Sequence, residues 1–214
     1  KRFSLELLCF KPNYIYRFRT SGVDPDPLIR VGTRSQESIV EGKRGLYFHH
    51  DTGFYRYSGG YPEKISKPID DIVKAIPFGQ YDDIGGWVDG DNVYWSLGGS
   101  VTVAEAKGNV TYTSVVVRFT ESSEVWTLYS YPTTINRGVP FVTSSSGSII
   151  IGLNTGVVAE FNKGNADLNE PIKYRMITKW YEGGEIENRK EIQEMIAIAE
   201  KGQGAQLMYQ VDDY

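Results

Sequence analysis

Short runs in which apolar and polar residues alternate recur along most of the chain. Alternation of this kind is typical of β-strands that bury one face. Four of the runs contain a triplet in which a charged residue lies between an apolar or aromatic residue and an aromatic one. The triplets are Tyr16-Arg17-Phe18, Tyr55-Arg56-Tyr57, Val117-Arg118-Phe119 and Ala159-Glu160-Phe161. Their recurrence at intervals of roughly 40–60 residues predicts a repeat protein, with units centred near 16–18, 55–57, 117–119 and 159–161.

The residues ahead of each triplet indicate a β-hairpin. Three triplets follow an apolar run and a turn rich in Asn, Asp, Gly or Pro, namely 11–13, 51–53 and 154–156. In the third unit the apolar run 93–97 is followed by the Gly-, Ala- and Lys-containing stretch 98–109, which we interpret as a loop insertion. Further extended segments come after the triplets. Each unit is therefore predicted to be a meander of about four antiparallel strands, similar to one blade of a β-propeller.

Two segments depart from this pattern. At 69–76 the apolar residues recur at helical spacing between Pro68 and Pro77, which predicts a two-turn helix between two units. In the last residues the pattern fits either a helix at 188–201 or two strands around the turn at 201–204, and we predict a C-terminal hairpin. The predicted fold class is thus all-β, with propeller-like repeats over 1–181 and a docking extension over 182–214.

Composition and charge agree with a β-protein and restrict its partners. The 214 residues include 15 Tyr, 9 Phe, 4 Trp and 23 Gly, a content typical of strands and turns. The net charge of −4 opposes binding to nucleic acid, sequence-specific binding included, because phosphate contacts require clustered Lys and Arg. No apolar run approaches the ~18 residues of a membrane span, so none is predicted. The single cysteine, Cys9, excludes an internal disulfide.

Residues that could perform catalysis are few and scattered. His49 and His50 are adjacent in one predicted strand, so they face opposite sides and cannot chelate one ion, and we interpret both as half-exposed. Carboxylates suited to glycosidase chemistry lie in or beside turns, at Asp82, Asp83, Asp89, Asp91, Asp212 and Asp213. The stretch 89–92 is typical of a hairpin turn and lacks the remaining ligands of a calcium loop. We therefore predict no enzymatic activity, no catalytic or metal-binding residue and no cofactor.

The aromatic and triplet residues are first of all structural candidates. Trp87, Trp95, Trp126 and Trp180 could stack on sugars, but aromatics in repeating strands more often form the core between sheets. The stretch 122–126 lacks the Asp and Gly of the hairpin found in sialidase-type propellers. Each triplet Arg is expected to lie beside a neighbouring aromatic ring. A carbohydrate-binding or glycoside-processing β-propeller is the alternative function.

Several segments resemble the propeller repeats of tail proteins from short-tailed phages, in the packaged-DNA stabilisation and tail nozzle group. These segments are 45–48 with 53–57, 92–97 and 151–156, and residues 171–180 with 189–192 are similar to the C-terminal part of such proteins. The resemblance implies a non-enzymatic virion tail protein made in the host cytoplasm. It also implies a ring of copies around the DNA exit channel, in contact with other tail or portal proteins, and it supplies no ligand-binding residue.

The first repeat, centred near 16–18, also predicts that the ring of blades is incomplete within these residues. The hairpin over 3–19 is predicted to supply only middle strands, so the chain is expected to open inside a blade. Unpaired strand edges at both ends of a four-unit array would seek partners, because their free N–H and C=O groups form hydrogen bonds with any available strand. We expect further blades upstream of Lys1, or another chain, to complete the ring.

Overall fold

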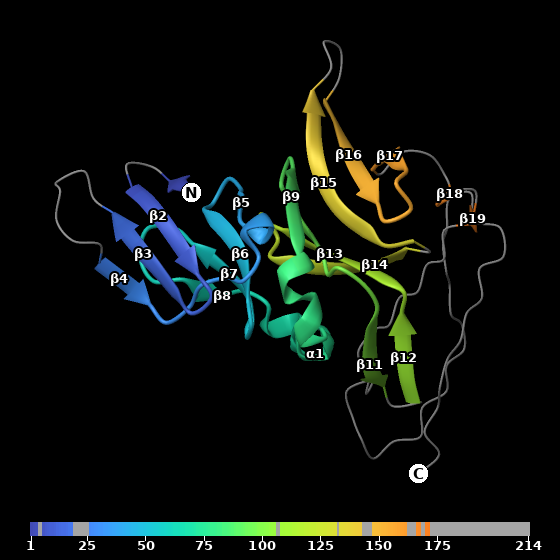
Figure 1. Cartoon of the computed structure of the whole chain (residues 1–214), viewed down its shortest axis with the longest axis horizontal. Helices are drawn as coiled ribbons and strands as arrows, with labels where there is room; N and C mark the ends of the chain where they lie inside the picture. Colours follow the sequence, from blue (N-terminus) through green and yellow to red (C-terminus); the bar gives the residue numbers. More distant parts are fainter. Residues whose placement is uncertain are drawn as a thin grey trace, which may run out of the picture. The chain divides into compact units, whose positions relative to one another are not determined.

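A computed structural model describes residues 1–3, 6–18, 26–105, 108–131, 133–142, 147–161, 166–167 and 170–171 (Figure 1). Lys1–Ile172 form one compact unit and Lys173–Tyr214 a second. The description below concerns the first unit. The predicted C-terminal hairpin, the boundary at 181, Trp180, Asp212 and Asp213 lie outside the described residues.

Antiparallel strands dominate the first unit, so the all-β class is confirmed (Figure 1). Each of four successive sheets, here called sheets 1 to 4, is built from consecutive strands apart from one insertion. Sheet 1 contains β1 (Arg2–Phe3), β2 (Glu6–Lys11), β3 (Tyr14–Phe18) and β4 (Asp26–Ile29). Sheet 2 contains β5 (Val40–Glu41), β6 (Leu46–His50), β7 (Gly53–Tyr57) and β8 (Glu63–Lys64).

The second half of the unit continues the same order. Sheet 3 contains β9 (Gly85–Asp89), β10 (Asn92–Ser96), β13 (Ser114–Thr120) and β14 (Val125–Tyr131). Sheet 4 contains β15 (Ile135–Val142), β16 (Gly147–Leu153) and β17 (Val158–Glu160). A short separate pair follows, made of β18 (Ala166–Asp167) and β19 (Glu170–Pro171).

The charged residue of every triplet lies in the third strand of its sheet and has the same place in the register. Arg17 pairs with Leu8, Arg56 with Tyr47, Arg118 with Tyr94 and Glu160 with Ile150. The recurring sequence triplet thus corresponds to one recurring position in the sheets.

Two local expectations are wrong. The insertion after β10 is not a loop, because β11 (Val101–Glu105) and β12 (Gly108–Tyr112) pair as a hairpin. Val101 and Val103 are buried while Thr102 between them is exposed, which is the two-residue period of a strand. The first hairpin also has a strand on each side, because β1 pairs with β2 and β4 pairs with β3, whereas the sequence predicted no strand ahead of the hairpin over 3–19. Arg2 and Phe3 pair with Leu7 and Glu6, the first two residues of β2.

The predicted helix at 69–76 is confirmed by α1 (Asp70–Ala75), which follows the 3₁₀ turn η2 (Lys67–Ile69). Val73 and Ile76 are buried, and the Asp70 carboxylate in the first turn accepts a hydrogen bond from Lys64 Nζ at 2.6 Å. Two further 3₁₀ segments, η1 (Gln36–Ser38) and η3 (Phe78–Asp83), precede the first strands of sheets 2 and 3. Among the described residues, no helix combines the length and the hydropathy needed to cross a membrane.

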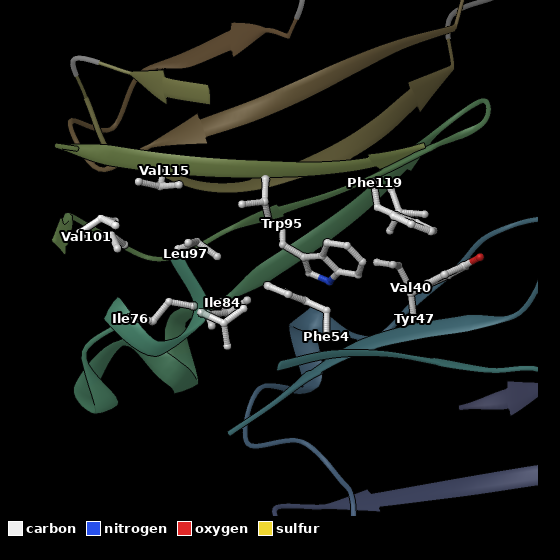
Figure 2. Packing of buried hydrophobic residues seen from close by; sticks show 14 residues of the cluster. Val40, Tyr47, Phe54, Ile76, Ile84, Trp95, Leu97, Val101, Val115 and Phe119 are labelled. Atoms are coloured by element: carbon white, nitrogen blue, oxygen red, sulfur yellow. The ribbon is translucent and has the colours of Figure 1, made fainter. Parts of the chain in front are cut away.

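Successive sheets pack face to face around three separate apolar cores. Alternate residues of one strand enter different cores: Leu46 and Phe48 face sheet 1, whereas Tyr47 between them faces sheet 3. Trp95 lies in the core between sheets 2 and 3 (Figure 2), and Trp87 in the core between sheets 3 and 4. The predicted inter-sheet position of these two indoles is confirmed. Strand β9, the first of sheet 3, contacts the first strands of both neighbouring sheets, β5 and β15.

Candidate functional site

Two groups of interacting polar side chains lie at opposite ends of sheets 2 and 3. In an antiparallel meander the turns after the first and third strands lie at one end, and the turn after the second strand lies at the other. The β5–β6, β9–β10 and β13–β14 turns therefore share one end, where Glu121 lies. The β6–β7 turn, with His49 and His50 beside it, lies at the opposite end.

Glu121, the first residue after β13, places a fully buried carboxylate against the β5–β6 turn of the neighbouring sheet. Its Oε2 accepts a hydrogen bond from the Lys43 backbone N–H at 3.0 Å, and its Oε1 accepts one from the Arg44 N–H at 3.1 Å. Gly45 allows the turn to fit there, because its φ of 151° disfavours a side chain and the Tyr57 carbonyl oxygen occupies the space that a Cβ would need. The carboxylate thus joins sheets 2 and 3 through backbone donors.

Charged pairs surround this carboxylate and also cross between the two sheets. Arg56 donates to Glu63 at 2.7 Å within sheet 2 and to Glu124 at 3.2 Å in the β13–β14 turn. Lys43 Nζ lies 3.4 Å from Asp91 in the β9–β10 turn. We call these six residues, Lys43, Arg44, Arg56, Asp91, Glu121 and Glu124, the Glu121 clasp. The acidic groups of the clasp belong to sheet 3 and the basic groups to sheet 2. Attraction between these opposite charges therefore favours the packing of the two sheets.

Tyr47 lies beside the clasp in the core between sheets 2 and 3. Burial, together with the nearby Glu121 carboxylate, raises the pKa of the Tyr47 hydroxyl far above its usual range. The phenol is therefore neutral at pH 7. Its buried ring lies 5.9 Å from Phe119 and 6.4 Å from Trp95 between centroids, so it joins the clasp to the apolar core.

At the opposite end the two histidines are buried, with 1% of His49 and 7% of His50 exposed, and the prediction that they are half-exposed is wrong. The reason is that β6 is a central strand whose two faces are both covered, so all five of its residues are buried. The predicted division between faces agrees with their contacts. His49 lies edge-on against Phe54 and Tyr81, at 5.1 and 5.0 Å, whereas His50 lies against Tyr55 at 5.8 Å.

A charged pair adjoins the two imidazoles. Arg34 Nε donates to both carboxylate oxygens of Asp51, at 3.1 and 3.2 Å, and its guanidinium lies over the Phe78 ring at 4.6 Å. Burial lowers the pKa of His49 to about 3, opposed by the charge of Asp51, and burial likewise lowers the pKa of His50. Within the described part of the chain, His49 Nε2 and His50 Nδ1 have no hydrogen-bond partner. Both imidazoles are thus neutral at pH 7.

His49 is expected to make the fold sensitive to acid. Its pKa is about 3 in the folded protein and about 6.5 in an unfolded chain, so the unfolded state binds the proton more tightly. The stability that depends on neutral His49 is complete above pH 6.5 and is lost as pH falls toward 3, at about 1.4 kcal/mol per pH unit. Urea unfolding of the wild type and of His49→Phe, at pH values from 7 to 4, measures this. The aromatic variant retains edge contacts but cannot be protonated, so equal pH slopes in the two proteins would contradict the assignment.

The carboxylates considered for glycosidase chemistry do not form one group. Asp82 and Asp83 are exposed at the end of η3, before β9 begins, whereas Asp89 is the last residue of β9. A strand of this length separates its ends by roughly 15 Å. The predicted hairpin turn at 89–92 is confirmed by the pairing of β9 with β10 and by Gly90 at a φ of 61°. Asp91 in that turn accepts the Ser122 N–H at 3.1 Å, so its carboxylate is already used in the packing of the turns.

The remaining residues considered in the sequence analysis are described by their contacts and their exposure. Trp126 is partly buried on the core between sheets 2 and 3, and its Nε1 donates to the Ile65 carbonyl at 3.1 Å. Arg118 lies over the Tyr129 ring at 5.5 Å, as predicted for a triplet Arg. Cys9 is exposed on β2. Within the part of the chain that the structure describes, no three His, Cys, Asp or Glu residues are grouped so as to hold a metal ion.

Comparison with known proteins adds no assignment to this geometry. No protein-family model matches the chain, and no curated protein matches it.

Proposed function

We propose that this chain is a structural, non-enzymatic subunit of a phage tail, of the nozzle or DNA-retention type, which assembles with copies of itself into a ring and contacts other tail or portal proteins. One observation supports the proposal most. Four sheets follow one another in chain order, each packed face to face on the next, and β9 contacts the first strands of both neighbouring sheets. Blades around a common axis have this arrangement, so the repeats are proposed to be blades of a β-propeller.

The contacts of the charged triplet side chains also support an architectural role. Arg56 connects sheet 2 to Glu124 of sheet 3. Arg118 donates to Thr127 Oγ1 at 3.0 Å and covers Tyr129, whose ring packs on the core shared with sheet 4. These side chains, which a catalytic protein could direct to a substrate, hold strands and sheets together here. The net charge of −4 is compatible with a channel along which DNA slides without being held.

The test is the assembly state of the 214-residue chain. Mass photometry and negative-stain electron microscopy across a range of protein concentrations should reveal closed rings of several copies. A monodisperse monomer at every concentration, with one cooperative thermal transition, would contradict the ring and the structural function built on it.

The alternative carbohydrate-binding function receives less support. Trp87 and Trp95 are buried between sheets and cannot form an exposed platform for a sugar ring. Trp126 is engaged through both its ring and its indole N–H. The structural proposal is therefore preferred.

A further inference from the structure

Each interface between neighbouring sheets joins the same two kinds of face. We call the face of a sheet that carries the charged triplet residue its forward face. The opposite face, which carries the two triplet residues next to it in the sequence, is called the backward face. In sheet 2 the backward face contains Leu46, Phe48 and Tyr57, which are fully buried against sheet 1. In sheet 3 it contains Val93, Trp95 and Phe119, which are equally buried against sheet 2. Backward faces are thus apolar surfaces covered by the forward face of the preceding sheet.

Sheet 1 has a backward face of the same design, yet it is exposed. Leu7 pairs with Phe18 as Leu46 pairs with Tyr57 and as Val93 pairs with Phe119. The counterparts in sheets 2 and 3 are at most 1% exposed, whereas Leu7 is 53% and Phe18 38% exposed. Cys9, which pairs with Tyr16, is exposed where Phe48 and Trp95 are buried. The register thus gives this exposed surface of sheet 1 the position that is buried between sheets in sheets 2 and 3.

Sheet 4 presents the complementary kind of face. Ile149, Ile151 and Phe161 point into the core shared with sheet 3, so Ile150, Val158 and Glu160 belong to the forward face. Val158 is 66% exposed, and the adjacent Val157 is 50% exposed. The triplet position on this face is acidic, with Glu160 in place of Arg, while the backward face of sheet 1 carries the basic Lys11, whose Nζ lies 5.6 Å from the Tyr16 ring centroid. Opposite charges on the two faces favour their association.

We propose that the backward face of sheet 1 in one copy of this chain binds the forward face of sheet 4 in the next copy, continuing the stacking of sheets across the subunit boundary. The inference rests on the proposed ring and names its interface. A contact between two different faces is heterologous, and repetition of such a contact closes into a ring when the rotation permits. The occupant of each face is thus a second copy of the chain, held by the packing already seen three times within one copy.

Disulfide trapping tests the contact directly, because Cys9 is the only cysteine in the sequence. In a Val158→Cys variant, mild oxidation should join Cys9 of one copy to residue 158 of the next. A non-reducing gel should then show a ladder of covalent multimers. The same variant with Cys9→Ser should show no ladder. As a matched control, Tyr61→Cys introduces a thiol at another exposed site, 78% exposed in the β7–β8 turn, and should also give none.

The other outcomes overturn the proposal in distinguishable ways. Wild-type dimers linked through Cys9 alone would indicate that two backward faces pair, and loss of both thiols in a product of monomer mass would indicate closure within one chain. Rings without a ladder would contradict the proposed interface but not the proposed function. A protein that stays monomeric would contradict both the interface and the function. Leu7→Asp supplies a second measurement: since Leu7 is exposed, the monomer should keep its thermal transition while the population of rings falls at least tenfold. Unchanged rings in this variant would contradict the proposal.

Discussion

Replacement of Trp95 by Ala is expected to lower the free energy of unfolding by about 3–5 kcal/mol, the range for large aromatic residues removed from a core. Trp95 is fully buried, with its ring 4.6 Å from Phe54 and 5.8 Å from Trp126 between centroids. Gly86 on the adjacent strand has no side chain that could fill the resulting cavity, because Trp95 occupies the space where its Cβ would lie, 2.9 Å from Cδ1. Chemical unfolding monitored by circular dichroism measures the change.

Two matched variants separate the causes of this loss. Trp95→Phe retains most of the apolar contact but removes the hydrogen bond from Nε1 to the Ser38 carbonyl, which is 3.0 Å long and buried. It should cost about 1–3 kcal/mol, the price of a buried carbonyl left without its donor. Tyr61→Ala, at a 78% exposed aromatic, should change stability by less than about 0.5 kcal/mol. A similar cost for the Trp95→Ala and Tyr61→Ala variants would contradict the inter-sheet core.

The elements that the sequence predicted well are those whose signal is local. The triplets lie on strands because alternating apolar residues can bury one face only in an extended conformation. The hairpin at 89–92 and the helix at 70–75 follow from Asp-Gly turn chemistry and from helical spacing between two prolines. The hairpin at 101–112 was missed because Gly and Lys around it suggested a loop, although Val101 and Val103 have the period of a strand.

The burial of the histidines could not be predicted from their own strand. Alternation shows which residues share a face, but it does not show whether both faces of a sheet are covered. His49 is buried because η3 brings Tyr81 against it, and His50 because sheet 1 packs on the other side. Both partners come from other parts of the chain, so the lowered pKa values depend on tertiary contacts that no local pattern encodes.

The Glu121 clasp was missed for a related reason. Its partners at Lys43 and Arg44 are backbone N–H groups in a turn of another sheet, and backbone donors leave no signature in a sequence. The one available signal was a carboxylate placed directly after the strand 114–120, next to the Ser-Ser turn. That signal describes an ordinary surface turn equally well, so it was not distinctive.

Glu121 provides the second large expected effect. Glu121→Gln should lower the free energy of unfolding by about 2–4 kcal/mol, because a carboxamide offers one acceptor oxygen where two backbone donors, Lys43 and Arg44, now share a carboxylate. The amide NH₂ would also face a backbone N–H in a buried site, and two donors cannot bond each other.

Glu124→Gln is the matched control in the same turn: its carboxylate is 56% exposed and pairs with Arg56 at 3.2 Å. Its cost should be below about 1 kcal/mol, since exposed pairs contribute little. Urea unfolding compares the two variants, and amide hydrogen exchange should show faster exchange at Lys43 and Arg44 only in Glu121→Gln. If both variants lost the same stability, or if exchange in the β5–β6 turn stayed unchanged, the buried carboxylate would not be what joins sheets 2 and 3.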